Sequence, residues 1–395
     1  MSESLVLAAA VRTPIGKFGG SLAALSAADL GTAAAVASLE RAALDPAVVD
    51  QAIFGHARQA GGGPNTARQI AHRAGVGVAS PAYTINQACG SGLQAVFSAA
   101  RAIRLGEAEV VLAGGTESMS NTPYMLPRAR WGYRLGHAEL TDGMYRDGFN
   151  DPLSGLVMGE TAEELADEIG IGREAADAYA ARSQQRCETA RAEGRFAAEI
   201  VPLTVQERRG EVIVDTDEHP RDGVVAEKLG GMEPVFREGG TVTAANASGI
   251  TDGAAALLVA SESAAVRHGL QPMARLVDWE VVGVEPRIMG IGPVPACENL
   301  LARQSLDFDS IDEVELNEAF ASQALACLAR LPFSEDRVNP DGGAISLGHP
   351  IGCTGARILV TLLHGMERRG GRRGIATLCV SGGLGLAALV DREGC

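Results

Sequence analysis

Short apolar runs alternate along the chain with apolar positions at helical spacing, an order typical of stacked βαβ units. Leu5–Val11, Ala82–Ile85 and Val110–Ala113 are predicted to be strands, and Gly114-Gly115 is predicted to close the last of them. A helix is predicted between the second and third strands from five apolar residues: Leu93, Val96, Phe97, Ala100 and Ile103. The pattern therefore predicts an α/β fold.

The C-terminal part of the chain repeats this plan. The glycine-rich turn 348–352 precedes a predicted helix, and a charged turn, Arg368–Arg373, leads to the predicted strand Ile375–Val380 before Gly382-Gly383. The apolar positions of that helix are Ile358, Leu359, Leu362 and Leu363. We therefore expect two similarly built, βαβ-rich halves.

Charged helices and an alternating strand are predicted between the halves. Thr161 and Glu164 match a capping box, which predicts the start of a first helix at this point. A second helix is predicted over Glu174–Glu193, ended by Gly194. Glu211–Val214 alternates as a strand does.

This middle segment, residues 120–243, is interpreted as an inserted loop domain that covers one face of the first half. It opens with an irregular stretch, residues 121–160, rich in Pro, Arg, Met and Gly. The N-terminal half is then formed by residues 1–119 together with 244–271, and the C-terminal half by residues 272–395.

The composition indicates a folded protein and argues against some classes of partner. Of the residues, 46% are apolar, 21% charged and only 4% aromatic, which suits a buried α/β core and not base-stacking platforms. The net charge, 34 − 49 = −15, argues against a nucleic-acid or anionic-membrane surface. No run approaches the ~20 apolar residues of a membrane span. We expect a protein that binds neither nucleic acid nor membranes.

The cysteines are separated from one another. They are Cys89, Cys187, Cys297, Cys327, Cys353, Cys379 and Cys395. Without CxxC spacing they predict neither a metal site nor a disulfide framework, and single thiols are typical of a reducing compartment. The Met-Ser-Glu-Ser start lacks the basic residues of a secretory signal. We therefore expect a cytoplasmic protein.

Cys89 follows a predicted strand and opens a predicted helix, with glycines at positions 90 and 92. Small residues there allow a sharp turn that exposes the side chain. The helix N-terminus favours the thiolate, which predicts a lowered thiol pKa and a nucleophile near neutral pH. A buried structural cysteine is the alternative that this pattern leaves open.

Three further polar residues are candidates, each with an ordinary alternative. His349, in a glycine-rich turn before a helix, suits a general base or hydrogen-bond donor, or has no task beyond the turn. Cys379 ends an apolar strand and could equally be a core cysteine. Asn317, flanked by acids, could equally be a turn or helix cap.

Together these residues make the chain resemble the thiolase family over nearly its full length. The motifs that carry the resemblance, in family order, are Asn86-Gln87-Ala88-Cys89-Gly90-Ser91-Gly92, Ala113-Gly114-Gly115-Thr116-Glu117-Ser118-Met119-Ser120, Asn246-Ala247-Ser248-Gly249, Asn317-Glu318-Ala319-Phe320, Gly342-Gly343-Ala344 with Gly348-His349-Pro350-Ile351-Gly352, and Cys379.

The resemblance implies duplicated halves that form five layers, α-β-α-β-α, with an inserted loop domain over the active site. It implies reversible condensation of two acetyl-CoA molecules to acetoacetyl-CoA and CoA through an acyl-cysteine. Coenzyme A and acyl-CoA are then substrates, with no permanently bound cofactor. It also implies a homotetramer, a dimer of dimers in which residues 121–160 resemble the tetramer-forming loop.

Carried over by motif, the resemblance implies a role for each candidate. Cys89 would be acylated and His349 would take its proton. Cys379 would move the proton on and off the α-carbon of acetyl-CoA. Asn317 would hold a water molecule that stabilises the enolate with His349. The backbone N–H groups of Cys89 and Ser381 would stabilise the tetrahedral intermediate, and such a donor is typically worth about 2.7–4 kcal/mol.

The resemblance also implies substrate contacts. Arg221 and Lys228 would lie near the adenine and phosphates of CoA, and Ser248 near the pantetheine arm, although both cations could be ordinary surface residues. Val157, Met158 and Met289 would line the acyl pocket.

The chain departs from the family pattern at two of these positions. Ser381 replaces the usual glycine, so a Cβ must fit there and a positive φ would be strained. Val157 stands where many short-chain members have histidine, which leaves the acyl-chain range open.

Three alternatives to this activity stay open. One is a thiolase of broader 3-ketoacyl-CoA range, as in fatty-acid β-oxidation. Another is a decarboxylating condensing enzyme that resembles ketoacyl synthases, which would not need the acid/base at Cys379. The third is a catalytically silent CoA-binding paralogue, against which the intact reactive positions argue.

Overall fold

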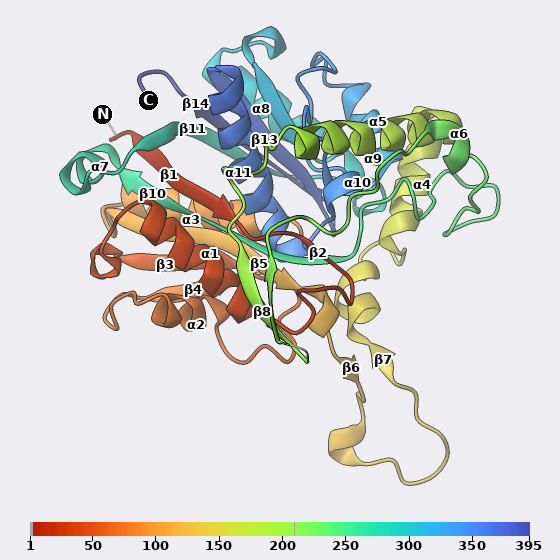
Figure 1. Cartoon of the computed structure of the whole chain (residues 1–395). Coiled ribbons are helices and arrows are strands. Elements are labelled where there is room, and N and C mark those ends of the chain that lie inside the picture. Colours follow the sequence, from red (N-terminus) through yellow and green to blue (C-terminus); the bar gives the residue numbers. More distant parts are fainter. Residues whose placement is uncertain (1–2, 209) are drawn as a thin grey trace.

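One sheet runs through the molecule in the computed structural model, which describes residues 3–208 and 210–395. Its strands are β1 (Leu5–Arg12), β2 (Gly16–Lys17), β3 (Gln51–Gly55), β4 (Ala82–Ile85), β5 (Val110–Ser118), β10 (Thr251–Ser261), β11 (Pro272–Gly283), β12 (Glu313–Leu316), β13 (Arg373–Val380) and β14 (Leu384–Asp391). Their order is β12-β13-β14-β11-β1-β10-β5-β3-β4, with β2 beside β10. Figure 1 shows the strands from both ends of the chain side by side in its centre.

The α-helices lie on both faces of this sheet and in the inserted segment. They are α1 (Ala27–Arg41), α2 (Thr66–Arg73), α3 (Ser91–Arg104), α4 (Met158–Ile169), α5 (Arg173–Ala192), α6 (Ala226–Leu229), α7 (Glu262–His268), α8 (Pro293–Gln304), α9 (Ala321–Leu328), α10 (Ala344–Leu347) and α11 (Ile351–Arg369). Among the described residues, no helix is long and apolar enough to cross a membrane.

Strand pairing repeats in the two halves. β5 pairs in parallel with β3 and antiparallel with β10, which pairs antiparallel with β1. In the other half β13 pairs in parallel with β12 and antiparallel with β14, which pairs antiparallel with β11. The halves join where β1 and β11 pair antiparallel. The predicted duplication is confirmed.

Three apolar clusters separate five layers. The central cluster packs α3 and α11 between the two halves of the sheet, with Phe97 and Leu359 fully buried. A second cluster lies between the first half of the sheet and α1 with α2. The third lies between the second half and helices α5, α8 and α9. The predicted α-β-α-β-α architecture is confirmed.

Close contact between α3 and α11 depends on two glycines. A Cβ added to Gly92 would lie 2.7 Å from the backbone nitrogen of Ala356, and one added to Gly355 would lie 2.4 Å from that of Leu93. Real Cβ atoms essentially never come so near to backbone atoms. Because Gly92 and Gly355 have no side chains, the backbones of α3 and α11 can pack in close contact.

β5 continues past the glycines that were predicted to end it. The strand runs to Ser118 because Gly114 and Gly115 lie inside the sheet and pair with β10. A Cβ on Gly114 would lie 2.2 Å from the carbonyl oxygen of Ala255 on β10. At these positions the glycines permit close approach and do not break the strand.

The inserted segment covers both halves, not the first half alone. Its helices α4 and α5 pack against α9 in the C-terminal half, and α5 also contacts α10. Its hairpin, β8 (Leu203–Glu207) and β9 (Gly210–Val214), packs its buried face against the outer core of the N-terminal half. The insertion therefore covers the C-terminal half in addition to the face of the first half where it was expected.

The start of α4 also differs from the prediction. Helix α5 agrees with the predicted second helix, but α4 begins at Met158 and not at a cap on Thr161. The backbone N–H of Val157 donates to the Glu160 carboxylate at 2.7 Å, so the capping acid is Glu160. The Thr161 hydroxyl bonds to the Met158 carbonyl within the first turn.

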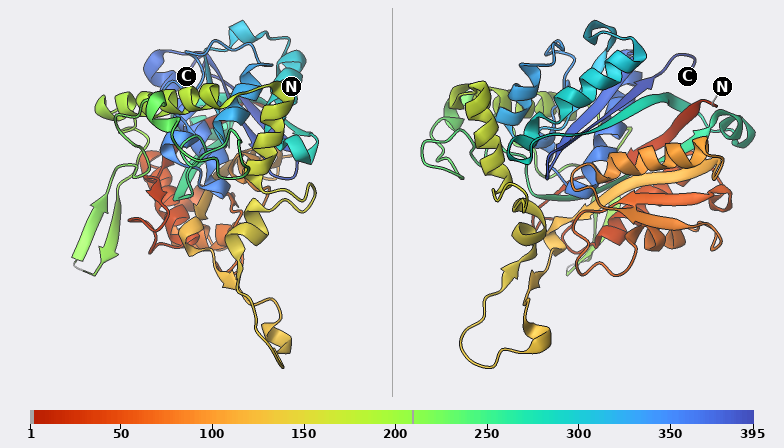
Figure 2. Two further views of the ribbon diagram at one scale, coloured as in Figure 1. Left: turned by 90° about the vertical axis from the view of Figure 1, so that its right-hand side faces the viewer. Right: turned by 180° about the vertical axis from the view of Figure 1, so that it is seen from behind.

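A long arm projects from the molecule within residues 121–160. It rises on the short strands β6 (Tyr124–Met125) and β7 (Thr141–Asp142) and carries large apolar side chains into solvent. Trp131 is 86% exposed and Leu135 98% exposed. Both views of Figure 2 show the arm standing away from the rest of the chain.

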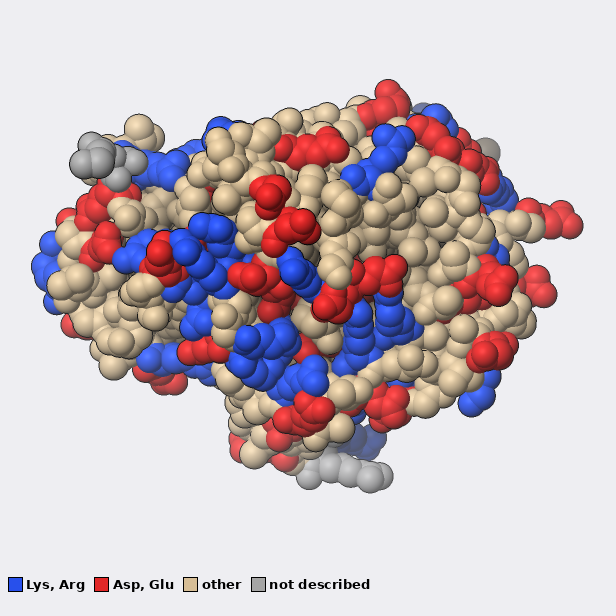
Figure 3. Space-filling model, turned by 90° about the horizontal axis from the view of Figure 1, so that it is seen from above, with Lys and Arg blue, Asp and Glu red and all other residues tan. Residues whose placement is uncertain are grey.

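Charged side chains of both signs share the surface. On the face drawn in Figure 3, acidic and basic residues are interspersed, with no broad region of one sign. Many form ion pairs, such as Arg303 with Asp278 at 2.7 Å. Exposed pairs of this kind contribute only about 0–1 kcal/mol each, and on this face no region of one sign defines a docking site.

Candidate active site

Cys89 lies at a sharp turn between β4 and α3. Ala88, immediately before it, has a φ of 44°. This left-handed conformation is unfavourable for any residue that has a side chain. The Ser91 hydroxyl accepts from the Gln87 N–H at 2.8 Å and donates to the Ala88 carbonyl at 2.6 Å. These bonds hold the turn that leaves the Cys89 side chain half-buried at the start of the helix.

His349 lies in the equivalent place before α11 and is held at Nδ1. That nitrogen is 2.6 Å from the Thr354 hydroxyl, which in turn donates to the Pro350 carbonyl at 3.0 Å. Because a hydroxyl has only one proton to give, Nδ1 is the donor to Thr354 and Nε2 carries the lone pair. Nε2 is buried without a partner among the described residues, so it is free to accept a proton.

Cys379 and Ser381 approach Cys89 from the end of β13. Cys379 is 1% exposed. The backbone N–H groups of Ser381 and of Cys89 itself donate to the Cys89 sulfur. Two backbone donors thus point to the Cys89 sulfur, the atom that would bond to the carbonyl carbon of a substrate.

Ser381 fits without strain. Positive φ values fall on the next residues, Gly382 at 85° and Gly383 at 82°, and Ser381 is not among the described non-glycine residues with a positive φ. The Cβ of Ser381 therefore occupies an ordinary backbone conformation, and the strain considered for this replacement does not arise.

Asn317 follows β12 and is fully buried. Its backbone N–H donates to Thr377 on the neighbouring β13 at 3.0 Å. Both polar atoms of its side-chain amide are buried without a partner among the described residues. Because a buried polar group costs free energy unless it is hydrogen-bonded, this amide is suited to a bound polar molecule.

A cavity of about 270 Å³ brings most of the candidates together. Cys89, His349, Cys379 and Ser381 line it together with Ser248. The candidate acyl-pocket residues line the same cavity: Val157, Met158 and Met289.

Three of the candidates do not line this cavity. Asn317 lies behind the wall, next to Ala319 and Phe320, which do line it. Arg221 and Lys228 are exposed at the surface.

The reactive groups are neutral. Burial raises the pKa of the Cys89 thiol above its usual value, although the Arg58 charge and the backbone N–H groups act against it. The prediction of a lowered pKa is therefore wrong, because desolvation outweighs the helix N-terminus. Burial, with the charges of Arg357 and Arg58, lowers the pKa of His349 to about 3. Burial also raises the pKa of Cys379 well above its usual value. The site holds a thiol next to a neutral imidazole, which is the pairing needed for proton transfer during attack.

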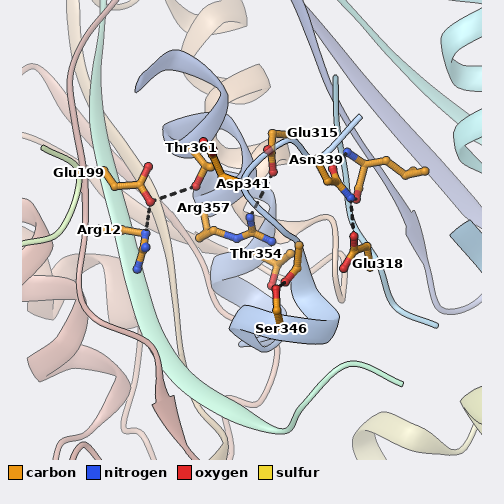
Figure 4. A network of polar contacts seen from close by, with 12 residues as sticks. Arg12, Glu199, Glu315, Glu318, Asn339, Asp341, Ser346, Thr354, Arg357 and Thr361 are labelled. Atoms are coloured by element: carbon orange, nitrogen blue, oxygen red, sulfur yellow. Dashed lines mark hydrogen bonds and ion pairs between the residues drawn. The ribbon is translucent and has the colours of Figure 1, made fainter. Parts of the chain in front are cut away.

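A buried ion pair supports α11 beneath His349. Figure 4 shows Arg357 on this helix pointing to Glu315 on β12, and their nearest charged atoms are 3.3 Å apart. Burial raises the pKa of Glu315 well above its usual value despite Arg357. The positive charge so placed helps to keep His349 unprotonated.

Glu117 ties the two halves together at the site. Its carboxylate accepts the backbone N–H groups of Arg58 at 3.0 Å and Gly352 at 2.8 Å, and it pairs with His56 at 3.2 Å. Burial acts to raise its pKa, but His56, the charge of Arg58 and the Gly352 N–H hold the pKa of Glu117 below its usual value. This anion anchors the turn of His349 to the N-terminal half.

Two domain models match almost the whole chain. The N-terminal domain of thiolase matches residues 5–263 and the C-terminal domain of thiolase matches residues 270–392. The chain belongs to the thiolase family. Sequence reasoning reached this family from the same motifs that now surround the cavity.

Relatives of this thiolase are similar over their full length. Acetyl-CoA acetyltransferase of Cupriavidus necator is 48% identical over 390 residues, covering 98% of this chain and 99% of that protein. The crystal structure of Bacillus anthracis acetyl-CoA acetyltransferase has a TM-score of 0.96 at 46% identity and covers 99% of both chains. Human mitochondrial 3-ketoacyl-CoA thiolase in complex with CoA has a TM-score of 0.95 at 41% identity, covering 98% of both chains.

Sequence reasoning about this thiolase missed Arg58, Glu117 and Thr354. Glu117 stood within a quoted motif, but nothing in the chain around it indicates its distant partners. Thr354 lies five residues after His349, a spacing that could have suggested contact across the start of a helix. Arg58 follows β3 and carried no signal, because its burial depends on residues 145–149.

Proposed function

We propose that this thiolase is an acetyl-CoA C-acetyltransferase, which converts two acetyl-CoA molecules reversibly to acetoacetyl-CoA and CoA. The observation that carries the proposal is the cavity in which Cys89, His349 and Cys379 meet. Two backbone N–H groups at the Cys89 sulfur add the donors that acyl transfer requires. The names of the relatives agree with this activity.

In the first half-reaction Cys89 attacks the thioester carbon of acetyl-CoA. His349 takes the thiol proton at Nε2, whose lone pair is exposed by the Nδ1 bond to Thr354. The N–H groups of Cys89 and Ser381 stabilise the oxyanion of the tetrahedral intermediate. CoA then leaves with the proton of Cys379, which becomes a thiolate, while an acetyl group stays on Cys89 and the Cys89 proton stays on His349.

In the second half-reaction Cys379 takes a proton from the α-carbon of another acetyl-CoA. Asn317, through a water molecule, and His349 stabilise the enolate oxygen, which accounts for the unpartnered amide of Asn317. The carbanion attacks the acetyl carbon and displaces Cys89, which recovers its proton from His349. Its raised pKa makes the Cys379 thiolate a stronger base for the α-proton, and in the reverse direction the thiol returns this proton to the carbanion.

Mass spectrometry tests the acyl-enzyme directly. Acetyl-CoA alone should add one acetyl mass to the peptide that contains Cys89. Cys89→Ser should remove both the label and turnover. A label elsewhere, together with normal turnover of Cys89→Ser, would refute the assignment.

Exchange of the acetyl-CoA α-proton with solvent deuterium tests the role of Cys379. It also separates a thiolase from a decarboxylating condensing enzyme, which does not need this acid/base. Cys379→Ser should still acetylate Cys89 slowly but lose exchange of the acetyl-CoA α-proton with solvent deuterium. Exchange at the wild-type rate in this variant would make Cys379 a core residue only.

CoA binding is proposed at the open end of the cavity. Ser248 would contact the pantetheine arm, since it lines the cavity. Arg221 and Lys228 would reach the phosphates, which is compatible with their exposure. CoA serves here as substrate and not as a permanent cofactor.

A broader 3-ketoacyl-CoA thiolase is the second candidate. The apolar side chain of Val157 in the cavity wall favours it, as does similarity to the human 3-ketoacyl-CoA thiolase. A kcat/KM series over 3-ketoacyl-CoAs of increasing length, with free CoA, separates the two candidates.

We also propose a homotetramer, a dimer of dimers, joined through residues 121–160. The exposed apolar side chains of the arm support it, because such a surface is costly in a monomer. They are Tyr124, Leu126, Trp131, Tyr133, Leu135 and Leu140. Light scattering should give about four times 40.8 kDa. A monomer at micromolar concentration would contradict the proposal, and a dimer would contradict the role of the arm.

We propose that the chain has three parts. They are an N-terminal half of residues 1–119 with 244–271, an inserted loop domain of residues 120–243, and a C-terminal half of residues 272–395. Pairing of β10 between β1 and β5 supports joining the two N-terminal pieces.

A cytoplasmic location is proposed as well, supported by the free state of all seven cysteines, which suits a reducing compartment.

A further inference from the structure

Arg58 is a buried cation without a counter-ion. It is 7% exposed, and its Nε is buried with no partner among the described residues. No ion pair within residues 3–208 and 210–395 includes its guanidinium. Burying a charge without a directly paired partner is costly, so this arrangement leaves the guanidinium able to bind a further anion.

The Arg58 charge lowers the pKa of Glu117, but the nearby acids make their direct ion pairs with other residues. Glu117 accepts the backbone N–H of Arg58 but pairs with His56, at 3.2 Å. Asp147, which shares a second, shallower cavity with Arg58, lies 3.7 Å from Arg146. Neither forms an ion pair with the Arg58 guanidinium.

The guanidinium faces the catalytic cavity. Arg58 lines its wall together with Cys89 and His349, and its charge acts on both of these residues. On the same wall stand Tyr145 and Phe149, from the short π-helical segment 145–149. A ligand on Cys89 would therefore share a small, mostly apolar space with one fixed positive charge.

Gly148 makes room for this charge. A Cβ added to Gly148 would lie 2.0 Å from Nη2 of Arg58 and 2.2 Å from its Cζ. The guanidinium thus lies directly on the glycine backbone. Gly148 permits the position that Arg58 takes in the wall.

We propose that Arg58 binds a carboxylate at the end of the acyl chain, so that this thiolase also takes 3-oxoacyl-CoA substrates of the dicarboxylic type. The inference rests on the proposed function, since it needs Cys89 as the acyl acceptor. A planar guanidinium offers paired donors that match a carboxylate. Because Arg58 and Cys89 line the same cavity of about 270 Å³, the bridging chain is short, as in a succinyl or glutaryl group.

The step needs no new co-reactant. The Cys89 sulfur bonds to C3 of the substrate as His349 takes the thiol proton. The C2–C3 bond breaks with its electrons on C2, and Cys379 protonates that carbon to release acetyl-CoA. Free CoA then attacks the ω-carboxyacyl group and gives its proton to Cys379. Cys89 leaves and recovers its proton from His349, while the carboxylate stays on Arg58 throughout.

Two substrates of equal length test the proposal. The assay measures kcat/KM for thiolysis of 3-oxoadipyl-CoA and of 3-oxohexanoyl-CoA by the full-length enzyme. The wild type should prefer the dicarboxylate by about 10-fold or more, as charged hydrogen bonds of this kind contribute. A wild-type preference for 3-oxohexanoyl-CoA would overturn the proposal without any variant.

Arg58→Met should abolish the preference by lowering kcat/KM for 3-oxoadipyl-CoA about 10- to 100-fold more than for 3-oxohexanoyl-CoA. Gly148→Ala, which displaces the guanidinium but keeps its charge, should reduce the preference in the same direction. Arg330→Met removes an exposed arginine and should leave the ratio unchanged. An equal loss for both substrates in Arg58→Met would mean that Arg58 acts only on Cys89, and would overturn the proposal.

The acyl-enzyme separates this inference from the proposed function. 3-Oxoadipyl-CoA should add a succinyl mass to the Cys89 peptide in the wild type. If acetyl-CoA labels Cys89 but 3-oxoadipyl-CoA does not, the inference fails and the proposed function stands. If neither labels it, both fail.

Discussion

Cys89 stands two residues before α3, and His349 stands two residues before α11, so that each half of the duplicated fold presents one reactive side chain at the start of a helix. The helix N-terminus carries partial positive charge, which favours a thiolate and disfavours an imidazolium. Burial disfavours charge on both. For His349, burial and the charges of Arg357 and Arg58 lower the pKa to about 3, in the same direction as the helix N-terminus. For Cys89 the helix N-terminus and burial oppose each other, and burial prevails.

The position two residues before the helix can therefore hold a proton donor in one half and a proton acceptor in the other. In the N-terminal half the positive φ falls on Ala88, at 44°, where a side chain makes it strained, and in the C-terminal half it falls on Gly348, at 101°, where glycine adopts it without strain. Through Gly352, Glu117 joins the turn of His349 to residues 56–58 of the N-terminal half. The catalytic pair therefore depends on the contact between halves and not on either half alone.

Removing the base should have the largest effect. His349→Asn should lower kcat about 10²–10⁴-fold, the usual contribution of a general base, because the Cys89 thiol then has no acceptor for its proton. The check is the rate of acetoacetyl-CoA thiolysis. His364→Asn, a buried histidine on the same helix that bonds to Ala10, is the control and should keep kcat. Equal losses in both variants would indicate a structural effect.

The two helix-start residues should weaken the fold at opposite ends of the pH scale. The pKa of His349 is lower in the folded state, at about 3, so below pH 6.5 the unfolded chain binds a proton that the folded chain does not. Stability is lost as pH falls from 6.5 toward 3, by roughly 3 kcal/mol at pH 4.5. The raised pKa of Cys89 acts in the opposite sense, because stability is lost as pH rises above the unfolded thiol pKa.

Urea unfolding at pH 7.0 and 4.5 measures the first of these effects. His349→Asn should lose less stability between the two pH values than the wild type does. Carboxylates contribute to both proteins alike and cancel in the difference. Identical losses would show that His349 titrates normally in the folded state.

Filling the glycine contact should separate the halves. Gly92→Ala and Gly355→Ala each force a Cβ onto the backbone of the facing helix, at 2.7 and 2.4 Å, and each should destabilise by about 1–3 kcal/mol. Gly231→Ala, with nothing within 4 Å, should change stability by less than about 0.5 kcal/mol. Denaturant midpoints decide the matter. A Gly92→Ala enzyme as stable as the Gly231→Ala control would mean that α3 and α11 can shift apart freely.

The smallest effect is expected at the acyl pocket. Acetoacetyl-CoA should be a good substrate, and five- and six-carbon 3-ketoacyl-CoAs should lie within about one to two orders of magnitude of it. Val157→His should narrow this range by lowering kcat/KM for the longer chains, since a polar wall raises the cost of placing methylenes there. Ten-carbon substrates that match acetoacetyl-CoA would replace the acetyltransferase assignment with the degradative thiolase.

Much of the fold was predictable because local patterns agree with it. β4 occupies the predicted residues 82–85, and α3 and α5 lie where apolar and charged periodicity predicted them. The errors have a common cause. Gly114 was predicted to end a strand, but it lies inside the sheet, where it permits close contact with β10. Thr161 was predicted to cap α4, but the capping side chain is that of Glu160. In both cases a partner distant in sequence, or a competing neighbour, decides the outcome.

The sequence by itself determined the family, the order of the elements and the identity of Cys89, His349, Cys379 and Asn317 as candidates, because these depend on residue types at fixed spacing. Only the tertiary structure decided how these groups ionise and what faces them. A pKa depends on desolvation and on charges brought from other elements, which no local pattern contains. Arg58 illustrates this most clearly, because its lack of a counter-ion exists only once β3 and residues 145–149 meet at the cavity wall.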